Sequence, residues 1–139
     1  MKSYELSSSN KMDERKISIL HIASDEKFID AANYLFEKAF PGSNHFVIPK
    51  SSFNKKLIYI KTLKNVEVAP YNRGLIYRLS RMTHNYDCVF LHGITELNST
   101  IFLSSEYKNK FIGILWGAEL YVPENFPERS LLGELTATI

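Results

Sequence analysis

The sequence predicts an α/β domain in which helices cover both faces of a mostly parallel sheet. The first observation is a set of short, nearly continuous apolar runs, the pattern of strands covered on both faces: ISILHIA (17–23), YDCVFLHG (86–93) and FIGIL (111–115). The second is that stretches of helical period separate these runs, as in sheets whose parallel strands are joined by right-handed crossovers. Together they indicate a Rossmann-like, three-layer α/β/α architecture.

The sequence predicts a helix directly after the first strand. Ser24 or Asp25 can serve as its N-cap, because either side chain can accept a hydrogen bond from the first turn. Apolar residues then recur at spacings of three and four as far as Phe40, and Pro41-Gly42 predicts the end of the helix. Three short β-rich pieces come next, each compatible with a strand: residues 45–49, 56–62 and 66–70.

The second half of the chain repeats this alternation. The spacing predicts a helix over residues 72–84, with apolar residues on one side and a basic opposite side. The strand at 87–91, a helix over 94–110 and the strand at 111–115 complete the order. We expect the first strand and the strands at 87–91 and 111–115 to be neighbours, so that the loops after them meet at one edge of the sheet.

Length and composition fit one domain with a single hydrophobic core. The chain has 139 residues, of which 45% are hydrophobic and 13% aromatic. Residues 1–15 are polar and lack periodicity, so we expect a flexible leader followed by a domain over residues 16–139. Because the sequence ends on the apolar run RSLLGELTATI, we also expect that it is truncated before a further, C-terminal domain.

The sequence has the features of a cytoplasmic protein. No apolar run approaches the roughly 20 residues that span a bilayer, and the N-terminus lacks the apolar core and cleavage site of a signal peptide. The single cysteine, Cys88, cannot form an internal disulfide, and its place in an apolar run predicts a buried free thiol.

Charge is unevenly distributed along the chain. Residues 50–84 hold eight basic residues against the single acid Glu67, so this segment carries a net charge of +7 and the remainder carries −5. A solvated basic face is the common outcome for such a run, and an anionic partner is the functional alternative. Because the interleaved aromatics and glycine-rich clamps of common nucleic-acid-binding modules are missing, we expect no nucleic acid and favour phosphates of another kind.

Polar residues follow the three apolar strands at the place where parallel sheets bind their ligands. They are His21, Ser24 and Asp25 after the first strand, His92 and Gly93 after the second, and Trp116, Gly117 and Glu119 after the third. Glycines let a ligand approach the backbone, carboxylates and imidazoles supply acid, base or hydrogen-bonding groups, and an indole offers a flat apolar wall. Such a cleft suits a sugar.

Each of these candidates also has a structural interpretation. His21 can be a buried histidine bonded to backbone rather than a catalytic base, and Trp116 can be a core aromatic that caps the sheet. His92-Gly93 and Glu119 can serve to stabilise turns.

Several common catalytic motifs are missing from the sequence. The turn HIASDEKF has no Gly-x-Gly-x-x-Gly pattern, which argues against NAD or FAD. There is no Walker A sequence, no Gly-x-Ser-x-Gly elbow and no His/Cys/Asp cluster at metal-ligand spacing. We therefore expect neither a cofactor nor a metal.

Three segments carry a resemblance to a known family: ILHIASDEKFIDAANYLFEKAFPG, VFLHG and ILWGAELY. Together they resemble the 4-acetamido-4,6-dideoxy-galactosyltransferases (TDP-Fuc4NAc:lipid II transferases) of bacterial surface-polysaccharide synthesis. The resemblance covers residues 17 to about 122 and is weakest over 43–70. WGAELY is its most specific piece, and Glu119 stands where the family favours Asp.

The resemblance implies the N-terminal, acceptor-side half of a GT-B glycosyltransferase of the bacterial cell envelope. Such a hexosyltransferase moves an amino-deoxy sugar from a dTDP-sugar, bound by the C-terminal domain, to an undecaprenyl-diphosphate-linked saccharide, without a bound metal. This half alone would be inactive. It would be peripheral at the inner face of the cytoplasmic membrane, with an anionic membrane surface as a further partner.

The resemblance also suggests roles for the candidate residues. A base must deprotonate the acceptor hydroxyl, and we rank Glu119 first, then His92, then Asp25. The residues expected to shape the acceptor pocket are His21, Ser24, Gly93, Trp116 and Gly117. The residues expected to face the membrane or the acceptor diphosphate are Arg73, Arg78 and Arg81.

The alternative from another class is a non-catalytic, stand-alone module with a Rossmann-like or flavodoxin-like fold that binds a partner or regulates it. A reading frame that continues past Ile139 into a second Rossmann-like pattern would favour the enzyme.

Overall fold

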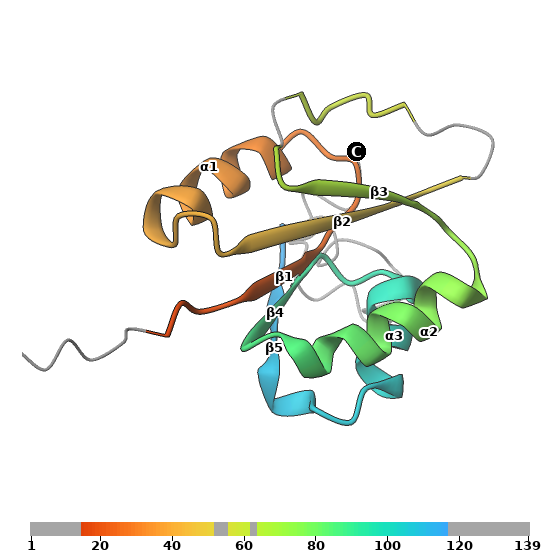
Figure 1. Cartoon of the computed structure of the whole chain (residues 1–139). Coiled ribbons are helices and arrows are strands. Elements are labelled where there is room, and N and C mark those ends of the chain that lie inside the picture. The colour runs from red at the N-terminus through yellow and green to blue at the C-terminus, as the bar shows by residue number, and fades with distance from the viewer. Residues whose placement is uncertain (1–14, 52–55, 62–63, 117–139) are drawn as a thin grey trace, which may run out of the picture.

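Five parallel strands form one sheet in the part of the chain that the computed structural model describes, residues 15–51, 56–61 and 64–116 (Figure 1). Their order across the sheet is β3-β2-β1-β4-β5. The strands are β1 (Ile19–Ile22), β2 (Asn44–Lys50), β3 (Val66–Pro70), β4 (Cys88–His92) and β5 (Phe111–Ile114). The predicted Rossmann-like class is confirmed, and so is the expectation that the strands now labelled β1, β4 and β5 are neighbours.

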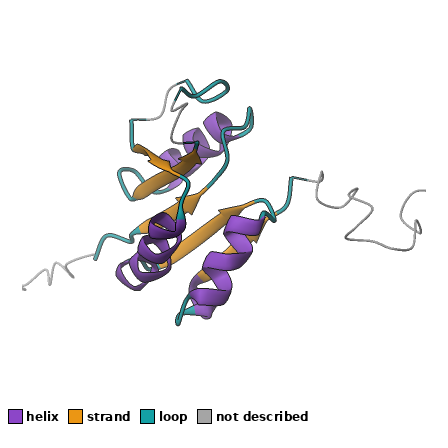
Figure 2. Cartoon of the chain, turned by 90° about the vertical axis from the view of Figure 1, so that its right-hand side faces the viewer, coloured by secondary structure: helices purple, strands orange, loops and turns teal. Residues whose placement is uncertain are grey.

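Helices cover both faces of this sheet. α1 (Ile29–Ala39) lies on one side, and α2 (Arg73–Met82) and α3 (Glu96–Ser104) lie next to one another on the other (Figures 1 and 2). Short 3-10 helices follow α2 and α3, at Thr83–Asn85 and Lys108–Lys110. Among the described residues, no helix is both long and apolar enough to cross a membrane.

The hydrophobic core consists of two clusters, one on each side of the sheet. Successive residues of a strand point to opposite faces, so Leu20 and Ile22 of β1 face α2 and α3, where they pack with Leu79 and Ile101. His21 points to the other face, where its ring stacks on that of Phe46. The second cluster lies on this α1 side and contains Ala23, Ile29, Phe46, Ile48 and Ile60.

α1 begins later than its sequence predicts. Its first helical residue is Ile29, and Phe28 precedes it without a side-chain cap, so the predicted N-cap at Ser24 or Asp25 is wrong. The carboxylate of Asp25 instead accepts hydrogen bonds from another segment of the chain, described below. The predicted end is confirmed, because α1 stops at Ala39 and Gly42 adopts a φ of +63° that favours glycine.

Two other predicted elements differ from the structure. Residues 56–61 are not a strand; three of their backbone N–H groups, from Ile58 to Ile60, donate to Asp25 rather than to a strand partner. The helix predicted over 94–110 ends at Ser104, and residues 105–107 separate it from the following 3-10 helix. Cys88 is half-buried rather than buried, and partial burial raises the pKa of its thiol.

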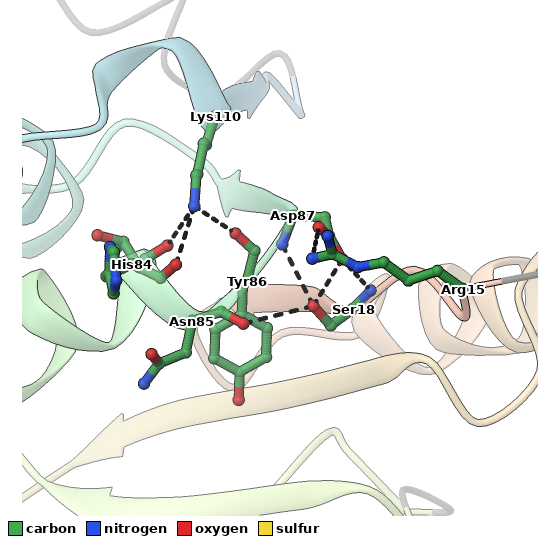
Figure 3. A network of polar contacts seen from close by, with 8 residues as sticks. Arg15, Ser18, His84, Asn85, Tyr86, Asp87 and Lys110 are labelled. Carbon is green, nitrogen blue, oxygen red and sulfur yellow. Dashed lines mark hydrogen bonds and ion pairs between the residues drawn. The ribbon is translucent and has the colours of Figure 1, made fainter.

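A polar network joins the start of the described chain to the turn before β4 (Figure 3). The Asp87 carboxylate accepts from the backbone N–H and the hydroxyl of Ser18, both at 2.9 Å, and pairs with Arg15 at 2.8 Å. The Lys110 ammonium donates to the carbonyl oxygens of Thr83, His84 and Tyr86 at 2.8–3.4 Å. These carbonyl oxygens lie at the C-terminal end of the helical segment, where the partial negative charge of the helix attracts a cation.

Candidate functional site

The carboxyl ends of the strands form the edge at which ligands are expected. From β1 the chain runs outward to β2 and β3, and then returns to β4 and β5 on the other side of β1. This reversal of strand order between β1 and β4 is the switch point where open α/β sheets bind ligands. Three segments lie at this edge: the loop that begins at Ala23, the loop that begins at Gly93, and Leu115-Trp116 after β5.

Two buried histidines contact one another across β1 and β4. Nδ1 of His21 lies 3.0 Å from Nε2 of His92, and the residues are 0% and 2% exposed. Each comes from a strand residue that points towards α1, and the β1–β4 register brings the two rings within reach. His21 thus bonds to side chains rather than to the backbone partner that its structural interpretation suggested.

A buried amide and a carboxylate extend this contact. Nε2 of His21 lies 3.2 Å from Oδ1 of Asn44, the first residue of β2. The Asn44 amide donates to Oε1 of Glu37 at 2.6 Å and to the carbonyl oxygen of Phe40 at 2.9 Å. The chain of contacts therefore runs from Glu37 on α1 through Asn44 and His21 to His92, and we call these four residues the histidine relay.

Aromatic rings surround the two imidazoles. Phe46 stacks on His21 with 4.1 Å between ring centroids, and Phe36 and Phe90 complete its surroundings at 4.5 and 5.3 Å. Burial in this setting lowers the pKa of His21 to about 3 and that of His92 to about 4. Both imidazoles are therefore neutral at pH 7.

The indole of Trp116 covers His92. The two rings stack with 5.9 Å between centroids, and Trp116 also stacks on Phe28, at 5.6 Å. The indole also packs against the α1-side core cluster, so part of its structural interpretation holds. Nδ1 of His92 is buried and has no hydrogen-bond partner among the described residues. A buried polar atom of this kind is a candidate contact for a ligand.

Gly93 makes the turn that follows His92. It adopts a φ of +91°, which favours glycine, and its backbone N–H donates to the carbonyl oxygen of Ile114 at 2.8 Å. The amide of Asn98 on α3 donates to the carbonyl oxygen of Gly93 at 2.8 Å. The turn after β4 is thus fixed from both β5 and α3.

Asp25 holds the segment that follows β2. Its carboxylate pairs with Lys50 at 3.0 Å and accepts the backbone N–H groups of Ile58, Tyr59 and Ile60 at 2.7–3.2 Å. Burial opposes ionisation, but these hydrogen bonds outweigh it and lower the pKa of Asp25 to about 2. The side chain is only 5% exposed, so its oxygens are engaged in structure. Ser24, beside it, is half-buried.

The three arginines predicted to face outward are exposed on α2. Arg78 pairs with Glu67 of β3, and Arg81 donates to the Tyr77 hydroxyl at 2.9 Å. A groove of about 960 Å³ runs along this helix, lined by α2 and by residues after α2 and α3. None of the residues of the histidine relay lines this groove.

Two predicted site residues, Gly117 and Glu119, lie outside the described residues. The sequence analysis missed Asn44 and Glu37. The signal for Asn44 was a polar residue that opens a strand otherwise buried, but nothing in the spacing connects it to His21. Within the described part of the chain, no group of three His, Cys, Asp or Glu side chains could hold a metal ion.

The fold and this edge define a Rossmann-like α/β domain with a buried polar site at the switch point of its sheet. No family model, curated protein or solved structure matches the chain. The proposed function therefore rests on the residues of the site and their geometry.

Proposed function

We propose that the chain is the acceptor-side domain of a glycosyltransferase that moves an amino-deoxy sugar from a dTDP-sugar to a lipid-diphosphate-linked saccharide. One observation carries the proposal: Nδ1 of His92, a buried nitrogen without a described partner, at the switch point of the sheet beside the indole of Trp116. Sugars suit such a place because they present hydroxyl donors next to apolar C–H faces.

His92 is the group that we assign to the acceptor hydroxyl. Of the three candidate bases, Asp25 has its carboxylate occupied by Lys50 and three backbone N–H groups. The neutral imidazole of His92 offers a lone pair to the hydroxyl proton. Glu119, first in the sequence ranking, stays a candidate for the same proton or for orienting the saccharide.

The reaction on this proposal is a substitution at the anomeric carbon of the donor. The acceptor oxygen forms the new bond while its proton passes to Nδ1 of His92, and the bond to the nucleotide diphosphate breaks with the electron pair leaving on the diphosphate oxygen. The imidazolium that results can keep donating from Nε2 to His21, so no other proton in the relay has to move.

Two further features support the proposal. The segments VFLHG and ILWGAELY, which carry the resemblance to glycosyltransferases, contain His92 and Trp116. The basic face of α2 suits a diphosphate or an anionic membrane, since each nearby Lys or Arg adds about 1 kcal/mol of attraction. A peripheral position at the membrane follows from a lipid-linked acceptor.

Acceptor binding to the 139-residue chain is the first test. A water-soluble, short-chain prenyl-diphosphate-linked N-acetylhexosamine is titrated into the protein and followed by NMR. We expect shifts at His92 and Trp116, and weaker binding in Trp116→Ala. Prenyl diphosphate without the sugar is the control and should leave the His92 signals unchanged. Binding that ignores both residues would contradict the proposal and favour a non-catalytic module.

Transfer is the second test and needs the complete reading frame together with a dTDP-sugar. His92→Gln should lower turnover by about 10²-fold or more, since a positioned proton acceptor is lost. Glu119→Gln tests the competing assignment under the same conditions. If only Glu119→Gln is slow, the base is Glu119 and His92 has another role.

A further inference from the structure

We propose that Asn44, oriented by Glu37 and by the Phe40 carbonyl oxygen, sets the tautomers of His21 and His92, so that the free nitrogen of His92 can only accept a hydrogen bond and the site selects a hydroxyl over an anion. The kind of ligand rests on the proposed function. Asn44 and Glu37 are the residues that decide which chemical group the site accepts.

The orientation of the Asn44 amide is the first step. Its nitrogen lies 2.6 Å from Oε1 of Glu37 and 2.9 Å from the carbonyl oxygen of Phe40, and both of these oxygens can only accept. The opposite orientation would place the amide oxygen against two acceptors. Oδ1 of Asn44 must therefore be the atom that faces His21.

The proton on His21 follows from that orientation. Because Oδ1 of Asn44 can only accept, Nε2 of His21 carries a hydrogen and donates it. The ring of His21 lies among Phe36, Phe46 and Phe90, where an imidazolium would be poorly solvated. A neutral His21 with its hydrogen on Nε2 leaves a lone pair on Nδ1.

The position of the hydrogen on His92 follows in the same way. Its Nε2 lies 3.0 Å from the lone pair of His21 and must donate to it. A neutral His92 with its hydrogen on Nε2 has no hydrogen on Nδ1, the atom that lacks a described partner. A hydroxyl can donate to this nitrogen, whereas a carboxylate or phosphate oxygen would bring one lone pair against another.

The remaining charged and titratable groups near the pair do not alter this assignment. Glu37 is joined to His21 by hydrogen bonds through Asn44, and its charge raises the pKa of His21, but burial outweighs this effect and lowers that pKa to about 3. His45 on β2 turns its Nδ1 to the hydroxyl of Tyr86. The competing arrangement has a cationic His21 and a hydrogen on Nδ1 of His92. That arrangement would make His92 a donor and suit an anion, so the two are distinguishable by experiment.

The first experiment measures the tautomers directly. Long-range proton–nitrogen correlations of the imidazole rings are recorded on the 139-residue chain at pH 7. We expect both rings to be neutral with the hydrogen on Nε2. A hydrogen on Nδ1 of His92, or an imidazolium at His21, would overturn the inference whether or not any sugar binds.

Two variants test whether Asn44 is the positioning residue. In Asn44→Ala the directing acceptor is lost, and we expect His92 to show a mixture of tautomers. In Glu37→Gln the amide of Asn44 still has the Phe40 carbonyl to donate to, so the wild-type tautomers should persist. Asn33→Ala, which removes another buried amide from the same region, is the matched control and should leave them unchanged. A wild-type spectrum in Asn44→Ala would overturn the role of Asn44.

The second experiment tests the selection of a hydroxyl. The prenyl-diphosphate-linked N-acetylhexosamine is compared with analogues in which one hydroxyl at a time is replaced by fluorine, which cannot donate. One analogue should bind about tenfold more weakly to the wild type and show no such difference in His92→Phe. If the tautomers are as expected but no sugar binds, the proposed function fails and the tautomer assignment stands. If every analogue binds equally well, the selection fails.

Discussion

The imidazoles of His21 and His92, 71 residues apart in the chain, share a hydrogen bond of 3.0 Å in the centre of the sheet. Both are buried, and no carboxylate of the described residues is hydrogen-bonded to either ring. Because both imidazoles are buried and neutral, the stability of the fold should depend on pH.

The free energy of unfolding should fall as the pH drops from about 6.5 towards 4. Burial lowers the pKa of His21 to about 3 and that of His92 to about 4, below the ordinary value of 6.5. Between these values the unfolded chain binds up to two more protons than the folded chain, so stability should decrease with falling pH at a slope approaching about 3 kcal/mol per pH unit. Urea unfolding at several pH values measures this slope.

A variant separates the histidines from other titrating groups. His92→Gln keeps a donor for His21 but cannot titrate, so it should lose about half of the slope between pH 6.5 and 4. Among the described residues, the other titratable groups whose charges act on His21 are Glu37 on α1 and His45 on β2. A free energy that stays constant from pH 6.5 to 4.5 would show that the pair takes up no proton on unfolding.

Asp25→Asn should destabilise the fold by about 3 kcal/mol, because a buried ion pair with Lys50 is broken and three backbone N–H groups lose a charged acceptor. Asp30→Asn is the matched control. Among the described residues, Asp30 accepts only the backbone N–H of Lys61 in the same segment, so its change should cost less than about 1 kcal/mol. Equal losses in chemical denaturation would argue against the role that we give to Asp25.

Lys110→Met should destabilise the fold by about 2 kcal/mol, because three carbonyl oxygens after α2 lose their cationic donor. Met retains most of the aliphatic stem, so the change reports mainly on the charge. Lys108→Met is the control, since the one carbonyl oxygen among the described residues to which the Lys108 ammonium donates is that of Ser105, at 3.1 Å. Thermal and urea unfolding measure both variants, and a larger loss in Lys108→Met would contradict this account.

The basic face of α2 should bind anionic liposomes. Arg78 is paired with Glu67, so Arg73 and Arg81 are the better residues to change. The double variant Arg73→Glu, Arg81→Glu should weaken binding to phosphatidylglycerol vesicles at least about tenfold, and added salt should weaken the wild type.

The control for this experiment reverses two lysines on the opposite side of the sheet, Lys27 and Lys38 near the ends of α1. Their exchange for Glu changes the net charge by the same amount and should affect binding less. Binding that is insensitive to salt, or equally weak in both double variants, would argue against α2 as the membrane-facing surface.

Local patterns determined most of the elements. Apolar runs predicted β1, β4 and β5 and their adjacency, because strands covered on both faces need such runs. β5 nevertheless lies at the edge of the sheet and is partly exposed, so the covering expected on both of its faces is wrong. The Pro41-Gly42 pair predicted the end of α1, since Pro and Gly act on the backbone of their own segment. The same patterns failed at residues 56–61, whose β-rich composition could not reveal that Asp25 takes three of their N–H groups.

The sequence by itself determined which residues lie at the carboxyl edge of the sheet, and it selected His21, His92 and Trp116 there. It could not connect them, because the contacts that define the site join β1 to β4 and to β2 across 71 and 23 residues, and a further contact joins β2 to α1. Only the tertiary structure placed Asn44 and Glu37 behind His21. The physical reason is that strand and helix periods depend on neighbours in the chain, whereas a buried hydrogen-bond chain depends on the register of strands that are neighbours only in space.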